Sequence, residues 1–288
     1  MKDYALIATA YDQHVRFYVS TTKNLVEHAR KIHQTWPTAT AASAMMGLMY
    51  KGDESLTISI KGDGPIGSML VEANAKGEVR GDIANPNVYI KYEDGPKKGK
   101  LNVGTAVGRG LLHVTKDLQM KSFFTSSSEL QTGEIAEDFT YYLATSEQVP
   151  SSVGLGVLVD TDQSVLASGG FILQLMPGCP ENVIAKIEKK ISQLPPVTSM
   201  LNKQMTIEEM LSLLADNTEN ILAKTPLDYT CNCSKESLSR SLSALDDKTL
   251  DELIFEDEHA EIKCHFCHTV YHFSAEELMK IKLSRKKK

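Results

Sequence analysis

Long hydrophobic runs are missing from this sequence. No stretch approaches the roughly 18 consecutive apolar residues that a membrane-spanning helix needs, so we expect no membrane partner. The first residues, MKDYALIATAYDQHVRFYVSTT, also lack the charged, apolar and small-residue zones of a signal peptide, because Asp3 and Asp12 interrupt the apolar stretch. We therefore predict a cytoplasmic protein.

Cysteine is scarce, and its distribution is uneven. Cys179 stands alone, whereas the other four of the five cysteines gather near the C-terminal end: Cys231, Cys233, Cys264 and Cys267. The pattern is C-x-C, thirty intervening residues, then C-x-x-C followed by His268. C-x-x-C-H also matches the c-type haem attachment signature, and C-x-x-C alone occurs in dithiol redox pairs. Stable disulfides belong mainly to exported proteins, as does covalent haem, so the expected location favours metal-bound or redox-active cysteines.

The spacing of these four cysteines indicates a zinc site. Zinc prefers tetrahedral coordination, and two close pairs of thiolates brought together by folding complete its shell. Four thiolates leave no open position, so the metal is predicted to be structural and not catalytic. We expect the neighbouring histidines to be surface or packing residues and not ligands: His259, His265, His268 and His272. A region as short as residues 231–288 rarely folds on its own core, so the metal should hold it together.

We predict an α+β protein with three parts. At 288 residues and 42% hydrophobic content, the chain can bury a sizeable core. Residues 1–178 are expected to form a large mixed α/β domain with strand-like runs divided by turns, 179–230 a helical linker, and 231–288 the zinc-binding domain.

Helix signals occur in all three parts. NLVEHARKIHQ and TATAASAMMGLMYKG are expected to be helices of the first part. In the linker, the apolar spacing around Ile187 predicts one helix, Pro195–Pro196 ends it, and a capping box of Thr206 and Glu209 starts another. In the last part, VYHFSAEEL predicts a strand followed by a helix capped at Ser274, with Glu277 completing the capping box.

The segment GDGPIG matches the dinucleotide-binding pattern G-x-G-x-x-G at Gly62, Gly64 and Gly67, with Asp82 about twenty residues later. That pattern requires a helix directly after it, whereas SMLVEANAKGEVRGDI has a turn at Lys76–Gly77. We therefore predict a β-hairpin here and find no enzymatic site.

Several stretches together resemble the 33 kDa chaperonin family, the redox-regulated heat-shock holdases. They include TAYDQHVRFYVSTT, KGDESLTISIKGDGPIGSMLVEANAKGEVRG, NVGTAVGRG, GEIAEDFTYYLATSEQVPSSVGLGVLVD, GGFILQLMPG, and C-x-C followed by C-x-F-C-x-x-x-Y-x-F. The resemblance covers almost the whole chain in order. The family's four zinc ligands fall on Cys231, Cys233, Cys264 and Cys267, while Cys179 matches no assigned role.

The resemblance implies an ATP-independent chaperone that is inactive when reduced and zinc-bound. It implies that oxidation pairs Cys231 with Cys233 and Cys264 with Cys267, that zinc leaves, and that the zinc domain and linker unfold. It further implies homodimers in the active form, and unfolding client proteins as partners. Thiolates, which zinc maintains at neutral pH, are the form of cysteine that reacts with peroxide.

Two other functions could use these cysteines. A nucleic-acid-binding zinc module needs a basic face, but the formal net charge is −6, LDDKTLDELIFEDEHAE is acidic, and the terminal RKKK is typical of a solvated tail. A thiol-disulfide oxidoreductase would use Cys264 and Cys267 as a dithiol, but it needs a βαβ context and leaves the C-x-C pair without a role. The holdase is therefore the favoured prediction.

Overall fold

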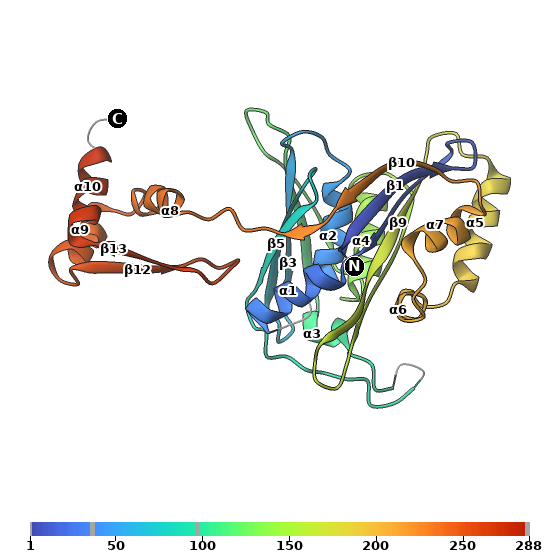
Figure 1. Ribbon diagram of the computed structural model, residues 1–288, viewed down its shortest axis with the longest axis horizontal. Coiled ribbons are helices and arrows are strands. Elements are labelled where there is room, and N and C mark those ends of the chain that lie inside the picture. The colour runs from blue at the N-terminus through green and yellow to red at the C-terminus, as the bar shows by residue number, and fades with distance from the viewer. Residues whose placement is uncertain (1, 35–37, 96–97, 286–288) are drawn as a thin grey trace. The chain divides into compact units, whose positions relative to one another are not determined.

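The computed structural model describes residues 2–34, 38–95 and 98–285. The chain divides into two compact units, Met1–Thr230 and Cys231–Lys288 (Figure 1). Within the described residues, no helix is both long and apolar enough to cross a membrane. Mixed strands and helices agree with the predicted fold class.

Two sheets form the framework of Met1–Thr230. The first has the order β10-β1-β2-β9-β8 and is antiparallel throughout. Its strands are β1 (Tyr4–Ala10), β2 (Val15–Thr21), β8 (Ser151–Val159), β9 (Val165–Leu175) and β10 (Asn220–Pro226). The second has the order β11-β5-β4-β3-β6-β7, in which only the β11–β5 pair is parallel. Its strands are β3 (Ser55–Gly62), β4 (Ser68–Asn74), β5 (Glu78–Ile83), β6 (Gly110–Asp117), β7 (Phe124–Glu129) and β11 (Asp228–Tyr229).

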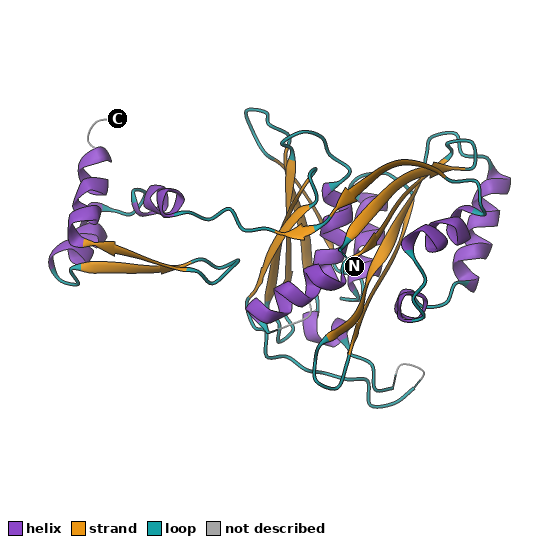
Figure 2. Cartoon of the chain, viewed as in Figure 1, coloured by secondary structure: helices purple, strands orange, loops and turns teal. Residues whose placement is uncertain are grey.

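Helices α1 (Lys23–His33), α2 (Thr38–Gly47) and α4 (Ile135–Thr145) contact strands of both sheets and lie between them (Figure 2). The small residues of α2 let it approach closely: a Cβ on Gly47 would lie 2.7 Å from the Asn74 carbonyl oxygen. A short helix, α3 (Val103–Val107), precedes β6. The inner core, which is the apolar cluster between the sheets, includes Phe139 and Tyr142.

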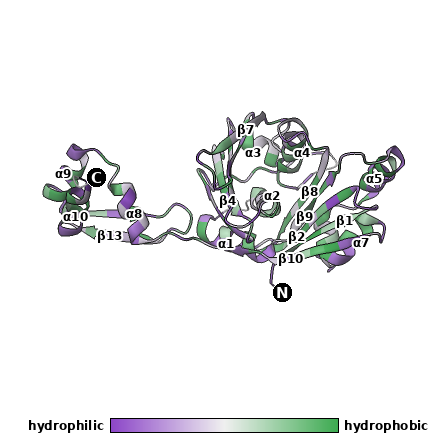
Figure 3. Cartoon of the chain, turned by 90° about the horizontal axis from the view of Figure 1, so that it is seen from above, coloured by the Kyte–Doolittle hydropathy of each residue, from purple (hydrophilic) through white to green (hydrophobic). Residues whose placement is uncertain are grey.

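A second layer of helices covers the opposite face of the five-stranded sheet. These are α5 (Glu181–Gln193), α6 (Val197–Asn202) and α7 (Ile207–Ala215). In α5 and α7, hydrophobic and hydrophilic residues occur side by side, as in amphipathic helices (Figure 3). The outer core lies between these helices and the sheet, with Phe17 and Val19 on the sheet side and Met210 and Leu211 on α7.

Most sequence predictions for this unit are confirmed. Thr206 and Glu209 form the predicted reciprocal capping box of α7. The G-x-G-x-x-G segment connects β3 to β4, which pair antiparallel, so the predicted β-hairpin is confirmed. The predicted linker, residues 179–230, is not purely helical, because it also contains the strands β10 and β11, which the sequence did not predict. The helix α6 was not predicted either, and the segment belongs to the same compact unit as residues 1–178.

In the unit Cys231–Lys288, the described residues 231–285 form a two-stranded sheet and three helices. Its elements are α8 (Lys235–Leu242), α9 (Asp247–Phe255), β12 (His259–Lys263), β13 (Val270–Ser274) and α10 (Ala275–Arg285). The predicted capping pair of Ser274 and Glu277 is present at the start of α10. A small core unites these elements and contains Leu242, Ile254, Ala260, Phe273, Leu278 and Ile281.

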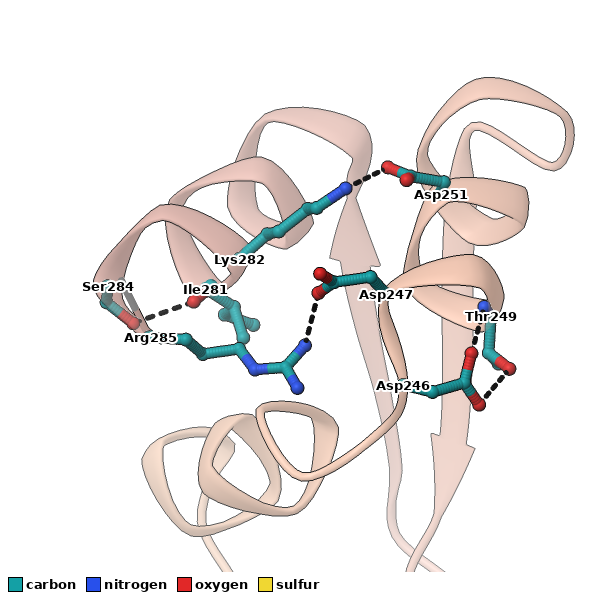
Figure 4. A network of polar contacts seen from close by, with 8 residues as sticks. All are labelled: Asp246, Asp247, Thr249, Asp251, Ile281, Lys282, Ser284 and Arg285. Atoms are coloured by element: carbon teal, nitrogen blue, oxygen red, sulfur yellow. Dashed lines mark hydrogen bonds and ion pairs between the residues drawn. The ribbon is translucent and has the colours of Figure 1, made fainter. Parts of the chain in front are cut away.

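Ion pairs tie α9 to α10 on the surface of this unit (Figure 4). Lys282 pairs with Asp251, and the Arg285 guanidinium lies 3.2 Å from the Asp247 carboxylate. Arg285 was predicted to belong to a solvated tail, but this pair attaches it to α9; the predicted tail residues 286–288 lie outside the described residues.

Candidate metal centre

The four C-terminal cysteines converge on one point. Within the described residues their sulfur atoms all lie within 4.8 Å of one another. The Sγ atoms of Cys231 and Cys264 are 3.6 Å apart, and those of Cys233 and Cys267 are 3.3 Å apart. Both close pairs join the C-x-C segment to the C-x-x-C segment, so the folded unit brings together residues more than thirty positions apart.

The second cysteine pair is presented by the turn between β12 and β13. The His268 N–H donates to the Cys264 carbonyl at 2.9 Å, and the Cys264 N–H donates to the Thr269 carbonyl at 2.9 Å. His268 completes the turn with a positive φ of 58°. This tight turn aims two sulfurs to the same side, as a zinc knuckle requires. A hairpin turn is also not the βαβ context that a thiol-disulfide oxidoreductase needs.

The first cysteine pair is held by contacts on either side of Cys233. The Tyr271 hydroxyl lies 3.1 Å from the Cys233 carbonyl oxygen and 3.2 Å from its sulfur. Lys235, two residues further on, forms an ion pair with Glu277 at 2.6 Å and lies 5.1 Å from the Phe273 ring centroid. These contacts fix the start of α8 against β13 and α10.

The supporting roles of Tyr271, Lys235 and Glu277 were not predicted from the sequence. Tyr271 and Phe273 alternate on one strand, so they share a face of β13. That period-two pattern directly after the knuckle was the available signal for Tyr271. The signal for Lys235 was weaker, because its partner Glu277 is distant in sequence and was recognised only as a capping residue.

The electrostatics of the cluster favour a bound cation. Burial raises the pKa of Cys231 to about 12, and burial also raises the pKa of Cys233. At Cys267, burial acts in the same direction, but hydrogen bonds with Thr269, Cys233 and Cys231 together outweigh it and lower the pKa to about 6. Four sulfurs this close cannot all ionise without a compensating positive charge, because like charges disfavour one another.

The donor set and spacing fit zinc. Two thiolates bound tetrahedrally at about 2.3 Å from one zinc ion lie roughly 3.8 Å apart, and the observed separations of 3.3 and 3.6 Å are close to this. The group of four contains no histidine. His272 lies on β13 with its ring 3.6 Å from the Glu261 carboxylate, and the His259 ring contacts the Asp257 carbonyl at 2.6 Å.

Cys179 lies outside this cluster. It belongs to the other unit, where its side chain packs partly buried against the outer core. Burial raises its pKa, so less of it is the reactive thiolate at neutral pH.

Comparison with known proteins identifies the family. The family model described as Hsp33 protein matches residues 3–274. The chain belongs to the Hsp33 family. It is 51% identical to the 33 kDa chaperonin of Acholeplasma laidlawii, with 99% of this chain and 100% of that protein aligned. It is 46% identical to the 33 kDa chaperonin of Bacillus subtilis, with 96% and 97% aligned.

The fold agrees with this membership. The crystal structure of the 33 kDa chaperonin of Thermotoga maritima matches with a TM-score of 0.89 and 32% identity, over 100% of this chain and 99% of that one. As an Hsp33 family member, the protein is a chaperone, and chaperones bind client proteins. The resemblance that the sequence motifs indicated is thereby confirmed.

Proposed function

We propose that this Hsp33 protein is an ATP-independent holdase switched on by oxidation of Cys231, Cys233, Cys264 and Cys267. The convergence of their four sulfurs within 4.8 Å carries the proposal. In the reduced state these cysteines would hold one zinc ion, which would keep all four sulfurs as thiolates. We further propose a cytoplasmic location and an activity that consists of binding and not of catalysis.

Oxidation of the four sulfurs would remove the ligands. Two thiolates give two electrons to one peroxide, which with two protons becomes two waters, and a disulfide forms between the sulfurs. We propose the pairs Cys231–Cys233 and Cys264–Cys267, following the family resemblance. A disulfide across one intervening residue closes a very small loop and constrains the unfolded chain little. It therefore cannot replace the metal as the source of stability for Cys231–Lys288.

The segment 179–230 is proposed to detach once Cys231–Lys288 has unfolded. Helices as short as α6 and α7 depend on packing for their stability. The residues that pack them are strongly apolar on both sides: Met210 and Leu214 of α7 face Phe17 and Val19 of the sheet. Detachment would expose both surfaces, and we propose that they bind unfolding client proteins and support a homodimer.

The test is light scattering of a heat-denatured client with this protein added, either reduced and zinc-loaded or oxidised, with released zinc measured in the same samples. We expect suppression only by the oxidised, zinc-free protein. If both forms suppress client aggregation equally and zinc is retained, the cluster is only a structural metal site and not a switch. Salt-dependent binding of RNA or DNA by the reduced form would instead favour a nucleic-acid-binding module.

A further inference from the structure

One continuous segment crosses from the edge of one sheet to the edge of the other. We call Asn220–Thr230 the strap. Its first part, β10, is the edge strand beside β1, and its second part, β11, is the edge strand beside β5. Between them, Leu227 enters the inner core and donates its N–H to the Asp3 carbonyl at 3.0 Å.

The C-terminal end of the strap has a short backbone ladder. The Asp228 N–H donates to the Gly77 carbonyl at 3.1 Å, and the Thr230 N–H donates to the Val79 carbonyl at 3.0 Å. Two residues of parallel pairing give little stability on their own, because a strand gains most of its stability from side-chain contacts with its neighbours. The attachment of β11 therefore depends on its side chains.

Tyr229 supplies that attachment. Its hydroxyl donates to the Gly81 carbonyl at 2.9 Å, accepts from the Gly81 N–H at 3.3 Å, and lies 3.2 Å from Nε2 of His33. The hydroxyl therefore has three polar neighbours on two different elements, β5 and α1. The ring also stacks on His28, with centroids 5.0 Å apart and planes 12° apart.

We propose that Tyr229 is a latch that stops unfolding of Cys231–Lys288 from spreading into the strap. The proposal rests on the proposed function, since it concerns how that switch is transmitted. Tyr229 lies two residues before Cys231, so a chain that unravels from its C-terminal side meets this anchor before Leu227 and β10. The latch thus sets how much oxidant is needed before α5–α7 are released.

The test replaces Tyr229 in the full-length, reduced, zinc-loaded protein and measures amide hydrogen exchange in the strap. Tyr229→Phe keeps the ring stack but loses the hydroxyl contacts, and the Asp228 and Thr230 amides should exchange about tenfold faster. Tyr229→Ala loses both, and about hundredfold faster exchange is expected. Both variants should reach full holdase activity at a lower peroxide dose, while their thiols oxidise at the wild-type rate.

Tyr92→Phe is the matched control. It removes a tyrosine hydroxyl contact of 2.7 Å, to Glu134, in the same unit but away from the strap. It should change neither strap exchange nor the activating dose.

The outcomes separate the two proposals. If oxidised wild-type protein fails to protect a client, the proposed function is wrong whatever the strap does. If wild-type protein is activated normally but Tyr229→Phe leaves the activating dose unchanged, the latch is wrong. A loss of protection in Tyr229→Phe that extends through β3, β4 and β6 would also overturn it, because Tyr229 would then stabilise the whole unit and not the strap.

Discussion

Removing the proposed zinc ion from the reduced protein should unfold Cys231–Lys288 and leave Met1–Thr230 folded. The apolar core of the smaller unit is small, and its buried members include Leu242, Leu250, Ile254, Ala260, Phe273, Leu278 and Ile281. A core in a domain under roughly 70–80 residues rarely supplies more than about 3–5 kcal/mol. Structural zinc contributes about 10–16 kcal/mol of apparent binding energy in small peptides. The loss therefore exceeds what the core provides by a factor of roughly two to five.

The assay is hydrogen exchange after chelation, with a thiol reductant present so that no disulfide forms. Amides of β12, β13 and α10 should lose protection, while those of β3 and β4 in the two-sheet unit should keep it. Cys179→Ser should behave as the wild type, since Cys179 lies outside the cluster. Full protection of His259–Lys263 and Val270–Ser274 in protein shown to be metal-free would refute the reasoning, because the core alone would then suffice.

Three further predictions concern single residues. Cys264→Ser should lower zinc affinity by more than about 100-fold in chelator competition, because even mutating residues that only hydrogen-bond to metal ligands lowers metal affinity about 10–100-fold. As a control, Cys179→Ser should keep wild-type zinc affinity. Gly77→Ala should lower the free energy of unfolding of Met1–Thr230, measured in urea, by roughly 1–3 kcal/mol. The reason is that φ of Gly77 is +83° and a Cβ there would lie 2.2 Å from the Pro226 carbonyl oxygen of the strap. As a control, Gly52→Ala should cost less, because Gly52 has φ +60° but open space around it. Burial raises the pKa of Asp3 from 3.8 to about 6, so the folded state binds more protons than the unfolded state between these pH values. The free energy of unfolding should therefore increase by up to about 2–3 kcal/mol, owing to the Asp3 carboxyl, as pH falls through that window. Asp3→Asn should remove this pH-dependent increase, which is measured by comparing urea midpoints at pH 4.5 and pH 7.

The features that were predicted correctly from the sequence are those determined by residues close together in the chain. Helix α7 was located because Thr206 and Glu209 are only three residues apart and satisfy each other's backbone groups. The turn at Lys76–Gly77 was located for a similar reason, because glycine readily adopts a positive φ. The cysteine cluster was predicted because metal chemistry restricts which residue types and spacings can close a tetrahedron.

The features that were not predicted depend on contacts between residues far apart in the sequence. Strand β10 pairs with β1, so Asn220 lies opposite Thr9 although almost the whole sequence of the unit separates these two residues. Most residues of β10 are exposed, Ile221 and Leu222 among them, and none is buried. Its sequence, NILAKTP, also shows no regular alternation of apolar and polar residues that would predict a strand. The contacts of Tyr229 with Gly81, His28 and His33 are likewise invisible to any local pattern, because they arise only when β11 lies beside β5.

The distribution of the two cores explains why the segment 179–230 could leave without destroying the rest of its unit. Among the described residues, the buried members of the inner core come from β1–β6, β9, α1–α4 and adjoining loops, and the only buried member after Ile172 is Leu227. The outer core, by contrast, requires α5–α7 for about half of its buried side chains, among them Ile187, Met200 and Met210. Both β10 and β11 are edge strands, so their removal breaks no sheet in the middle. A folded body of residues 1–178 is therefore the expected product of release, and its newly exposed face would be the apolar surface of β1, β2 and β9 that α5–α7 now cover.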